Sequence, residues 1–152
     1  MTSVLYDEIF VKFLGNIQDF DIPNMDNSDV NSMMIEYLHN ALSKVYVRRL
    51  FKSVNFNDEE KTLTYELNII IDEEQDKDFV TRIAAKGMVV EWLSPLVKSK
   101  LNISQMFTGS EQKFYSQSNH LSELRALLDD SKRELEKEIL DRNFEHNAYL
   151  GD

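Results

Sequence analysis

Three histidines and one acidic run are the residues whose types and spacing come closest to chemistry in this chain. His39, His120 and His146 lie far apart in the sequence, and the residues around them lack the spacing of zinc ligands. The chain has no cysteine, so disulfides and thiolate metal sites are excluded. Residues 72–78 (Asp-Glu-Glu-Gln-Asp-Lys-Asp) offer many oxygen ligands, but they lack the central glycine and the closing glutamate of an EF-hand calcium loop.

Phosphate binding and nucleophilic catalysis have no candidate residues either. The four glycines are spread along the chain, and no two are close enough to cradle a phosphate. The serines near His120 do not form a nucleophile elbow. We therefore predict that the protein is not an enzyme, with no catalytic residue, no cofactor and no metal ligand. A small regulator that binds a divalent cation through residues 72–78 is the least favoured alternative.

Composition predicts one globular domain over residues 1–152, without affinity for nucleic acid. Hydrophobic residues make up 42% of the chain, which is enough for a modest core. The formal net charge is −10, and no dense lysine–arginine cluster is available to bind a phosphate backbone. An acidic surface is nevertheless suited to line a passage to which DNA must not adhere. No apolar run approaches the ~20 residues that span a membrane, so no membrane contact is expected.

Apolar periodicity predicts two helices in the first part of the chain. The first helix runs from a cap at Thr2 or Ser3 to a stop at Gly15. The second helix begins at Ser28 or Asp29. Its apolar residues mark one wide face: Val30, Met33, Met34, Tyr37, Leu38, Ala41, Leu42 and Val45.

The middle of the chain changes to strand character. Residues 62–67 alternate with period two after the turn-like residues 57–60, and the isoleucines at 69–71 extend the second strand. A β-hairpin insertion at about residues 51–71 is therefore expected. It must pack on helices, because an isolated hairpin is only marginally stable.

Two further helices are predicted after the hairpin. One covers about residues 76–93 and is broken at Ser94-Pro95, where a helix can also restart because proline suits the first helical position. Gly87 in its middle costs ~1 kcal/mol relative to alanine, which indicates that another backbone packs closely there. The other helix covers residues 112–149, a stretch without proline or glycine. At ~1.5 Å per residue it would be ~55 Å long and would partly project beyond the core of its own chain. The predicted fold class is mainly α, a helical bundle with a long C-terminal helix and a small β-hairpin insertion.

Charge is distributed unevenly along the chain. Residues 51–78 carry nine acidic and three basic groups, whereas residues 79–110 carry one acidic and four basic groups. One copy could therefore dock its acidic side on the basic side of a neighbour, as in a head-to-tail ring. The alternative is that the two segments simply face solvent in different places.

Three stretches together resemble the small head–tail connector (neck or adaptor) proteins of tailed bacteriophages. They are residues 13–20 (Phe-Leu-Gly-Asn-Ile-Gln-Asp-Phe), residues 87–95 (Gly-Met-Val-Val-Glu-Trp-Leu-Ser-Pro) and residues 114–124 (Phe-Tyr-Ser-Gln-Ser-Asn-His-Leu-Ser-Glu-Leu). These are packing and capping segments and carry no chemical signature. The hairpin and the acidic residues that follow it match the family least well.

The resemblance implies a structural virion protein located in the neck at the portal vertex of the capsid and made in the host cytoplasm. Copies would form a homo-oligomeric ring, commonly a dodecamer, between the portal protein and the tail or further neck proteins. The ring would extend the DNA channel, and DNA would pass through without specific binding. The alternative within the same setting is a phage assembly chaperone or scaffolding factor that is absent from the virion.

Candidate residues for this role fall into two sets. The expected core anchors are Met88, Trp92 and Leu93. The expected interface residues are four arginines and the leucine stripe of the last predicted helix, and the stripe is expected to pack either on the body of its own chain or on a neighbour: Arg48, Arg49, Arg133, Arg142, Leu121, Leu124, Leu128 and Leu135.

Overall fold

The computed structural model describes residues 2–17, 27–106 and 111–150, and this part of the chain is mainly helical with one small antiparallel sheet. The predicted mainly α class is thereby confirmed. The elements follow in the order β1 (Thr2–Leu5), α1 (Tyr6–Asn16), α2 (Asn27–Ser43), α3 (Val45–Arg48), β2 (Phe51–Asn57), β3 (Thr62–Leu67), α4 (Glu73–Met106) and α5 (Glu111–Leu150).

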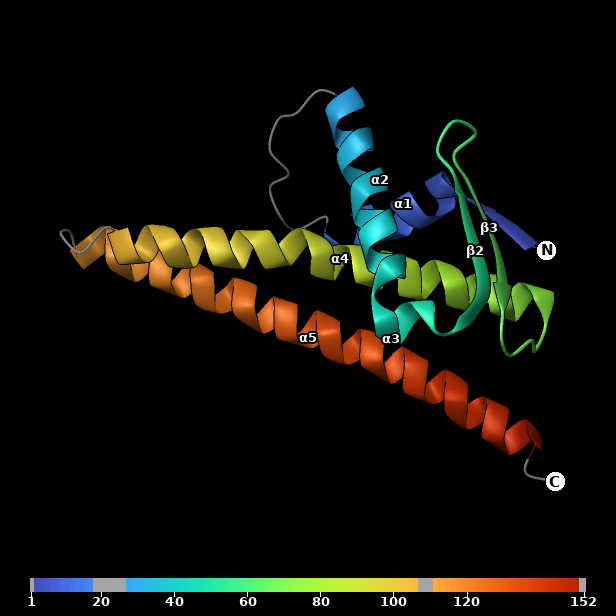
Figure 1. The fold of residues 1–152 in the computed structure, drawn as a ribbon. Coiled ribbons are helices and arrows are strands. Elements are labelled where there is room, and N and C mark those ends of the chain that lie inside the picture. Colours follow the sequence, from blue (N-terminus) through green and yellow to red (C-terminus); the bar gives the residue numbers. More distant parts are fainter. Residues whose placement is uncertain (1, 18–26, 107–110, 151–152) are drawn as a thin grey trace.

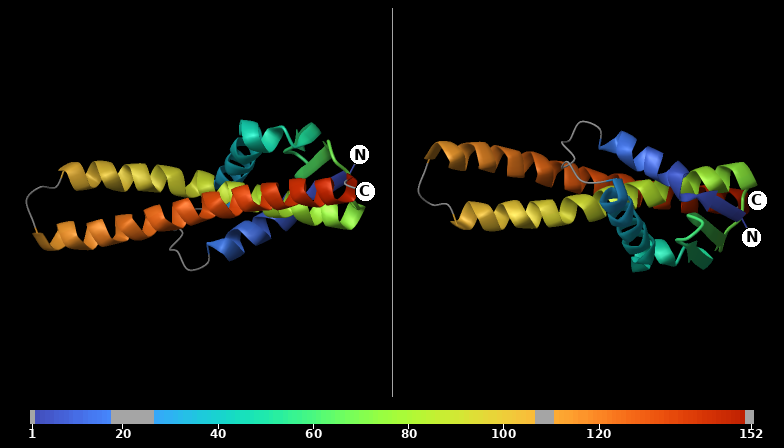
Figure 2. Two further views of the ribbon diagram at one scale, coloured as in Figure 1. Left: turned by 90° about the horizontal axis from the view of Figure 1, so that it is seen from below. Right: turned by 90° about the horizontal axis from the view of Figure 1, so that it is seen from above.

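Helix α4 is the element on which α1, α2 and α5 pack. Figures 1 and 2 show α5 running alongside α4, α2 crossing it steeply and α1 packing on a further side, with the sheet near the N-terminal end of α4. Its buried residues accordingly lie on several sides of the helix rather than on one stripe, because each neighbour needs its own apolar face. They are Phe79, Val80, Ile83, Ala84, Ala85, Met88, Val89, Val90, Trp92 and Leu93.

The first residues of the chain form a strand, so the prediction of a helix cap at Thr2 or Ser3 is wrong. Strand β1 pairs antiparallel with β3, from Thr2 opposite Tyr65 to Leu5 opposite Thr62. Val4 is buried beneath this pairing. A third strand adds the backbone hydrogen bonds and buried face that a lone hairpin lacks. Helix α1 begins at Tyr6 instead, where the Leu5 N–H donates to the Glu8 carboxylate at 3.2 Å.

The predicted hairpin is confirmed as β2 and β3, and it lies in a sheet of order β1-β3-β2. Along β3 the residues Leu63, Tyr65 and Leu67 are buried and their neighbours are partly exposed, as the alternation predicted. The strand ends at Leu67, so its predicted extension through residues 69–71 is wrong. The backbone there bonds to side chains of α4 and α5 instead of to another strand, as described below.

Helix α4 passes through the predicted break at Ser94-Pro95 and continues to Met106. Proline in a helix interior removes one backbone hydrogen bond and costs ~3 kcal/mol. This local cost is the reason why the sequence predicts a break at Ser94-Pro95. Tertiary packing overrides it here, because α5 lies alongside α4 (Figure 1) and Trp92 and Leu93 before the proline are buried.

Helix α2 buries part of its predicted apolar face, with Met34, Leu38, Ala41 and Leu42 in the core. The face ends before Val45, which is 80% exposed. The helix stops at Ser43, and the short α3 begins at Val45 after Lys44, whose backbone is extended. The assignment of Val45 to the buried face is therefore wrong.

The close approach predicted at Gly87 is confirmed, and it joins α4 to α2. A Cβ atom placed on Gly87 would lie 2.8 Å from the Cβ and 3.6 Å from the Cα of Ala41. An alanine methyl cannot rotate away, so only movement of the α2 backbone could make room. The two small residues thus set the distance between the two helices.

We predict that Gly87→Ala lowers the free energy of unfolding by ~1–3 kcal/mol, because overpacking outweighs the ~1 kcal/mol gained in helix propensity. Urea denaturation followed by circular dichroism measures this change. Gly15→Ala in α1 is the matched control, since a Cβ there meets nothing within 4 Å. The control should be neutral or slightly stabilising. Equal effects of the two substitutions would contradict the close packing of α2 on α4.

Candidate interaction surface

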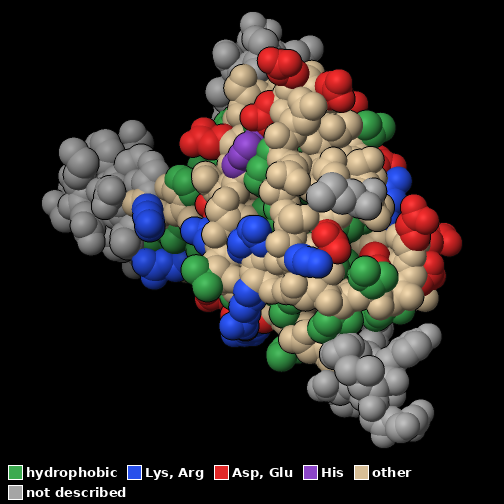
Figure 3. Space-filling view, turned by 45° about the vertical axis from the view of Figure 1, so that its right-hand side comes forward, with side chains coloured by type: hydrophobic (Ala, Val, Ile, Leu, Met, Phe, Trp, Pro, Cys, Tyr) green, Lys and Arg blue, Asp and Glu red, His purple; other side chains and the backbone are tan. Residues whose placement is uncertain are grey.

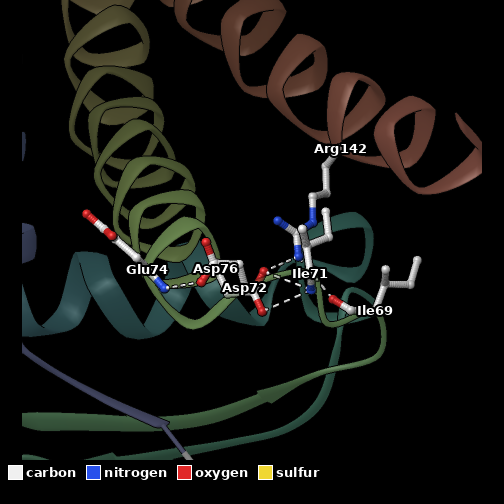
Figure 4. A network of polar contacts seen from close by, with 6 residues as sticks. All are labelled: Ile69, Ile71, Asp72, Glu74, Asp76 and Arg142. Carbon is white, nitrogen blue, oxygen red and sulfur yellow. Dashed lines mark hydrogen bonds and ion pairs between the residues drawn. The ribbon is translucent and has the colours of Figure 1, made fainter. Parts of the chain in front are cut away.

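A buried ion pair joins the first turn of α4 to the C-terminal part of α5 (Figure 4). Asp76 and Arg142 are each only 6% exposed, and the Arg142 Nη2 atom contacts Asp76 Oδ1. The same nitrogen donates to the carbonyl of Ile69 at 3.1 Å, and the Ile71 N–H lies 3.3 Å from both Asp76 oxygens. The guanidinium carbon lies 4.9 Å from the centre of the Phe79 ring.

Asp72 caps the N-terminus of α4, next to this ion pair. Its carboxylate accepts from the Glu74 N–H at 3.3 Å, in the manner of an N-cap, and its carbonyl accepts from the Asp76 N–H at 2.8 Å. Acidic side chains in the first turn also suit the positive end of the helix dipole. The acidic run therefore forms the predicted start of the helix and also supplies one buried carboxylate. Asp76 faces inward, whereas most of its neighbours face solvent.

The leucine stripe of α5 packs on the body of the same chain. Leu121, Leu124, Leu128 and Leu135 are buried, and the last three belong to the main core. Two ion pairs flank the stripe, Arg82 with Glu138 and Lys86 with Glu134, each at 3.3 Å. These pairs are partly exposed and each contributes little.

The predicted arginines separate into one internal residue and three exposed ones. Arg142 is used within its own chain, which corrects its assignment as a salt-bridge partner for a neighbouring subunit. Arg48 and Arg49 are exposed, and Arg48 Nη1 donates to the Phe51 carbonyl at 2.9 Å. Arg133 is 79% exposed and lies 3.9 Å from the Asp130 carboxylate. The predicted core anchors Met88, Trp92 and Leu93 are buried.

Sequence reasoning missed the Asp76–Arg142 pair, although a signal for it was present. Leu121, Leu128, Leu135 and Arg142 follow one another at intervals of seven residues. That spacing places Arg142 on the same face of the helix as the buried leucines. An arginine on that line must find a buried carboxylate, but the sequence does not say which acidic residue supplies it.

A second polar junction connects α1, α2 and the hairpin turn. The Tyr6 hydroxyl donates to Asp58 Oδ1 at 2.6 Å, and His39 Nε2 lies 2.9 Å from the same oxygen. His39 also stacks on Phe56, with ring centres 3.9 Å apart. Burial, followed by the hydrogen bond to Asp58, raises the pKa of Tyr6. The hydrogen bonds from Tyr6 and His39 lower the pKa of Asp58.

A surface hollow of about 610 Å³ lies between α3, α4 and α5. Lysines stand around it, and its apolar lining includes Tyr46, Val90 and Pro95. In Figure 3 most lysines and arginines gather toward the lower left and middle of the visible face, while aspartates and glutamates gather toward the top and right. We name the hollow the basic groove, and its lysines are Lys44, Lys98 and Lys132.

No other chemical centre emerges in the described part of the chain. The residues described there contain no group of three His, Cys, Asp or Glu side chains able to hold a metal ion. His120 and His146 lie among residues whose side chains the structure does not describe. Among the described helices, none is both long enough and apolar enough to cross a membrane.

Comparison with known proteins gives no relative for this chain. No protein-family model matches it, and neither a curated protein nor a solved structure shows significant similarity. Any assignment of function therefore depends on the residues and geometry of the chain itself.

We predict that Asp76→Ala lowers the free energy of unfolding by ~3–5 kcal/mol, because it leaves the Arg142 charge buried without a partner. The double variant Asp76→Leu, Arg142→Met should be much closer to wild type, since neither charge remains. Urea denaturation of the three proteins measures both values. The exposed pair Lys52–Glu66, 3.7 Å apart, is the control, and Glu66→Gln should cost about 0–1 kcal/mol. Equal losses for Asp76→Ala and Glu66→Gln would exclude a buried ion pair.

Two tyrosines provide a matched test of the polar contact between Tyr6, His39 and Asp58. Tyr6→Phe removes a hydrogen bond and should cost ~1 kcal/mol. Within the described part of the chain the buried Tyr65 hydroxyl has no hydrogen-bond partner. Burial, followed by the charges of Asp76 and Glu73, raises the pKa of Tyr65 to about 12. Tyr65→Phe should therefore be neutral or stabilising, because it removes an unpaired polar atom. Thermal denaturation compares the two, and a larger loss for Tyr65→Phe would contradict this arrangement.

Proposed function

We propose that this protein is a head–tail connector of a tailed bacteriophage, a structural virion protein that forms a ring between the portal and the tail. The observation that carries the proposal is the antiparallel pair of α4 and α5. In Figures 1 and 2 this pair extends well beyond α1, α2 and the sheet, so one end of it has no cover from the rest of the described chain. A connector needs such an element to reach a neighbouring subunit or the portal.

The internal contacts of the pair fix α5 on α4 within the body of the protein, from which the pair projects. The Asp76–Arg142 pair holds the end of α5 to the start of α4, and the buried leucines continue that contact toward the middle of both helices. In this proposal the helices form a bundle, and the long C-terminal helix α5 transmits contacts between subunits. Residues 1–152 act as one connector domain in which residues 112–149 partly project.

The charge of the chain is compatible with a position around DNA. A net charge of −10 opposes adhesion of the DNA backbone to a ring through which DNA must pass. The resemblance of residues 13–20, 87–95 and 114–124 to head–tail connectors supplies the biological setting.

The proposal predicts that the purified protein adds a ring to the portal ring encoded by the same genome. Sedimentation velocity should show a heavier complex, and negative-stain images should show an extra layer with a fixed number of copies. The protein should also be present in purified virions at that same copy number. A protein that neither binds the portal nor occurs in virions would contradict the connector role and favour an assembly chaperone.

A further inference from the structure

Two surfaces of opposite charge lie at separate places along α4. The first is the basic groove, where Lys98 and Lys132 have no carboxylate partner among the described residues. Lys44 pairs with Glu91 at 3.3 Å, and Glu136 also lines the groove. The groove therefore offers two free ammonium groups over a partly apolar floor.

The second surface is the start of α4, which we name the acidic edge and define by Asp72, Glu73, Glu74 and Asp78. All four side chains are exposed, and none forms an ion pair within the described part of the chain. Next to them stands Ile70, a large apolar side chain that is 71% exposed. The acidic edge therefore combines carboxylates that form no ion pair among the described residues with one exposed apolar group.

The two surfaces match each other in both charge and polarity. Carboxylates of the acidic edge would meet the ammonium groups of Lys98 and Lys132. Ile70 would meet the apolar floor formed by Tyr46 and Pro95. Opposite charges at a rim and apolar contact at the centre are the usual composition of a specific protein interface.

One chain cannot bring its own two surfaces together. Glu74 and Lys98 lie in the same helix, 24 residues apart. At ~1.5 Å per residue their separation along the axis is ~36 Å, several times the ~8 Å Debye length of physiological salt. Contact between different patches on identical chains is a head-to-tail interface, which closes into a ring when the rotation allows.

We infer that the basic groove of one copy receives the acidic edge of the next copy. This inference rests on the proposed ring function and identifies the surfaces that build the ring. The alternative ligand of a basic groove is nucleic acid. The free carboxylates and the exposed isoleucine elsewhere on the same chain favour a second copy, and the overall charge of −10 opposes a polyanion.

Disulfide cross-linking tests the interface directly, because the natural chain has no cysteine. The variant Glu74→Cys, Lys98→Cys should give a ladder of covalent multimers after mild oxidation, in isolation or on the portal ring. A mixture of the two single-cysteine variants should give the mixed dimer in preference to either symmetric dimer. The control is Glu60→Cys, Lys98→Cys, since Glu60 is exposed in the turn between β2 and β3, at the opposite end of β3 from the start of α4 (Figure 1). A ladder no stronger than that of the control would overturn the inference.

Charge reversal tests whether the same contact depends on the lysines. Lys132→Glu in the double-cysteine background should reduce the multimers to the control level. Adding Glu73→Lys should restore them, because the two reversed charges would meet across the interface. If Lys132→Glu leaves the ladder unchanged, the basic groove does not receive the acidic edge.

The outcome separates this inference from the proposed function. Portal binding without a cross-link between positions 74 and 98 would keep the connector role and discard this interface. Cross-linking without portal binding would keep the interface and discard the connector role. Binding of a short DNA duplex that is lost in Lys98→Glu, together with no cross-link, would assign the groove to nucleic acid and overturn the inference.

Discussion

Burial of α4 on three sides constrains the three helices that pack on it, α1, α2 and α5. Helices α1, α2 and α5 each present an apolar face to α4. The distance of each helix from α4 depends on the size and polarity of the α4 side chains at the point of contact. Where α2 crosses, Gly87 and Ala41 allow the two backbones to approach closely. In the first turn of α4, where α5 approaches, Asp76 occupies a buried position that would otherwise hold an apolar side chain. The same burial explains why Pro95 does not end the helix, because packing along both neighbouring turns outweighs one lost hydrogen bond.

The Asp76–Arg142 pair gives α5 a defined position along α4. A thin leucine stripe alone would tolerate a shift of α5 by one turn, since each leucine would find another apolar neighbour. A buried guanidinium tolerates no such shift, because it must meet Asp76, the Ile69 carbonyl and the Phe79 ring at once. Buried ion pairs contribute little net stability but exclude arrangements that leave a charge unpaired. The pair also ends β3 early, because the backbone of Ile69 and Ile71 bonds to these two side chains.

Features that depend on local sequence could be predicted, and features that depend on distant partners could not. Alternation in residues 62–67 predicted β3, and one glycine inside a helical pattern predicted a close backbone approach, which the structure places at α2. Strand β1 escaped prediction because its partner residues lie more than 50 positions away, and Val4 and Leu5 also fit a helical pattern. Of the candidate interface residues, the leucines and Arg142 pack within the chain, whereas Arg48, Arg49 and Arg133 remain exposed. The lysines of the basic groove come from three separate helices or their flanks, so no single stretch of sequence indicates them.

A rigid α4–α5 pair underlies both the proposed connector role and the proposed ring interface, because it keeps two charged surfaces apart and carries an arm beyond the body. Amide hydrogen exchange measures that rigidity most directly. Residues 121–143 of α5 should exchange with a protection similar to that of residues 79–93 of α4, since both segments contribute to one core. Exchange of residues 121–143 at the rate of an exposed helix, while α4 stays protected, would show that α5 is not held on α4 and would contradict the account.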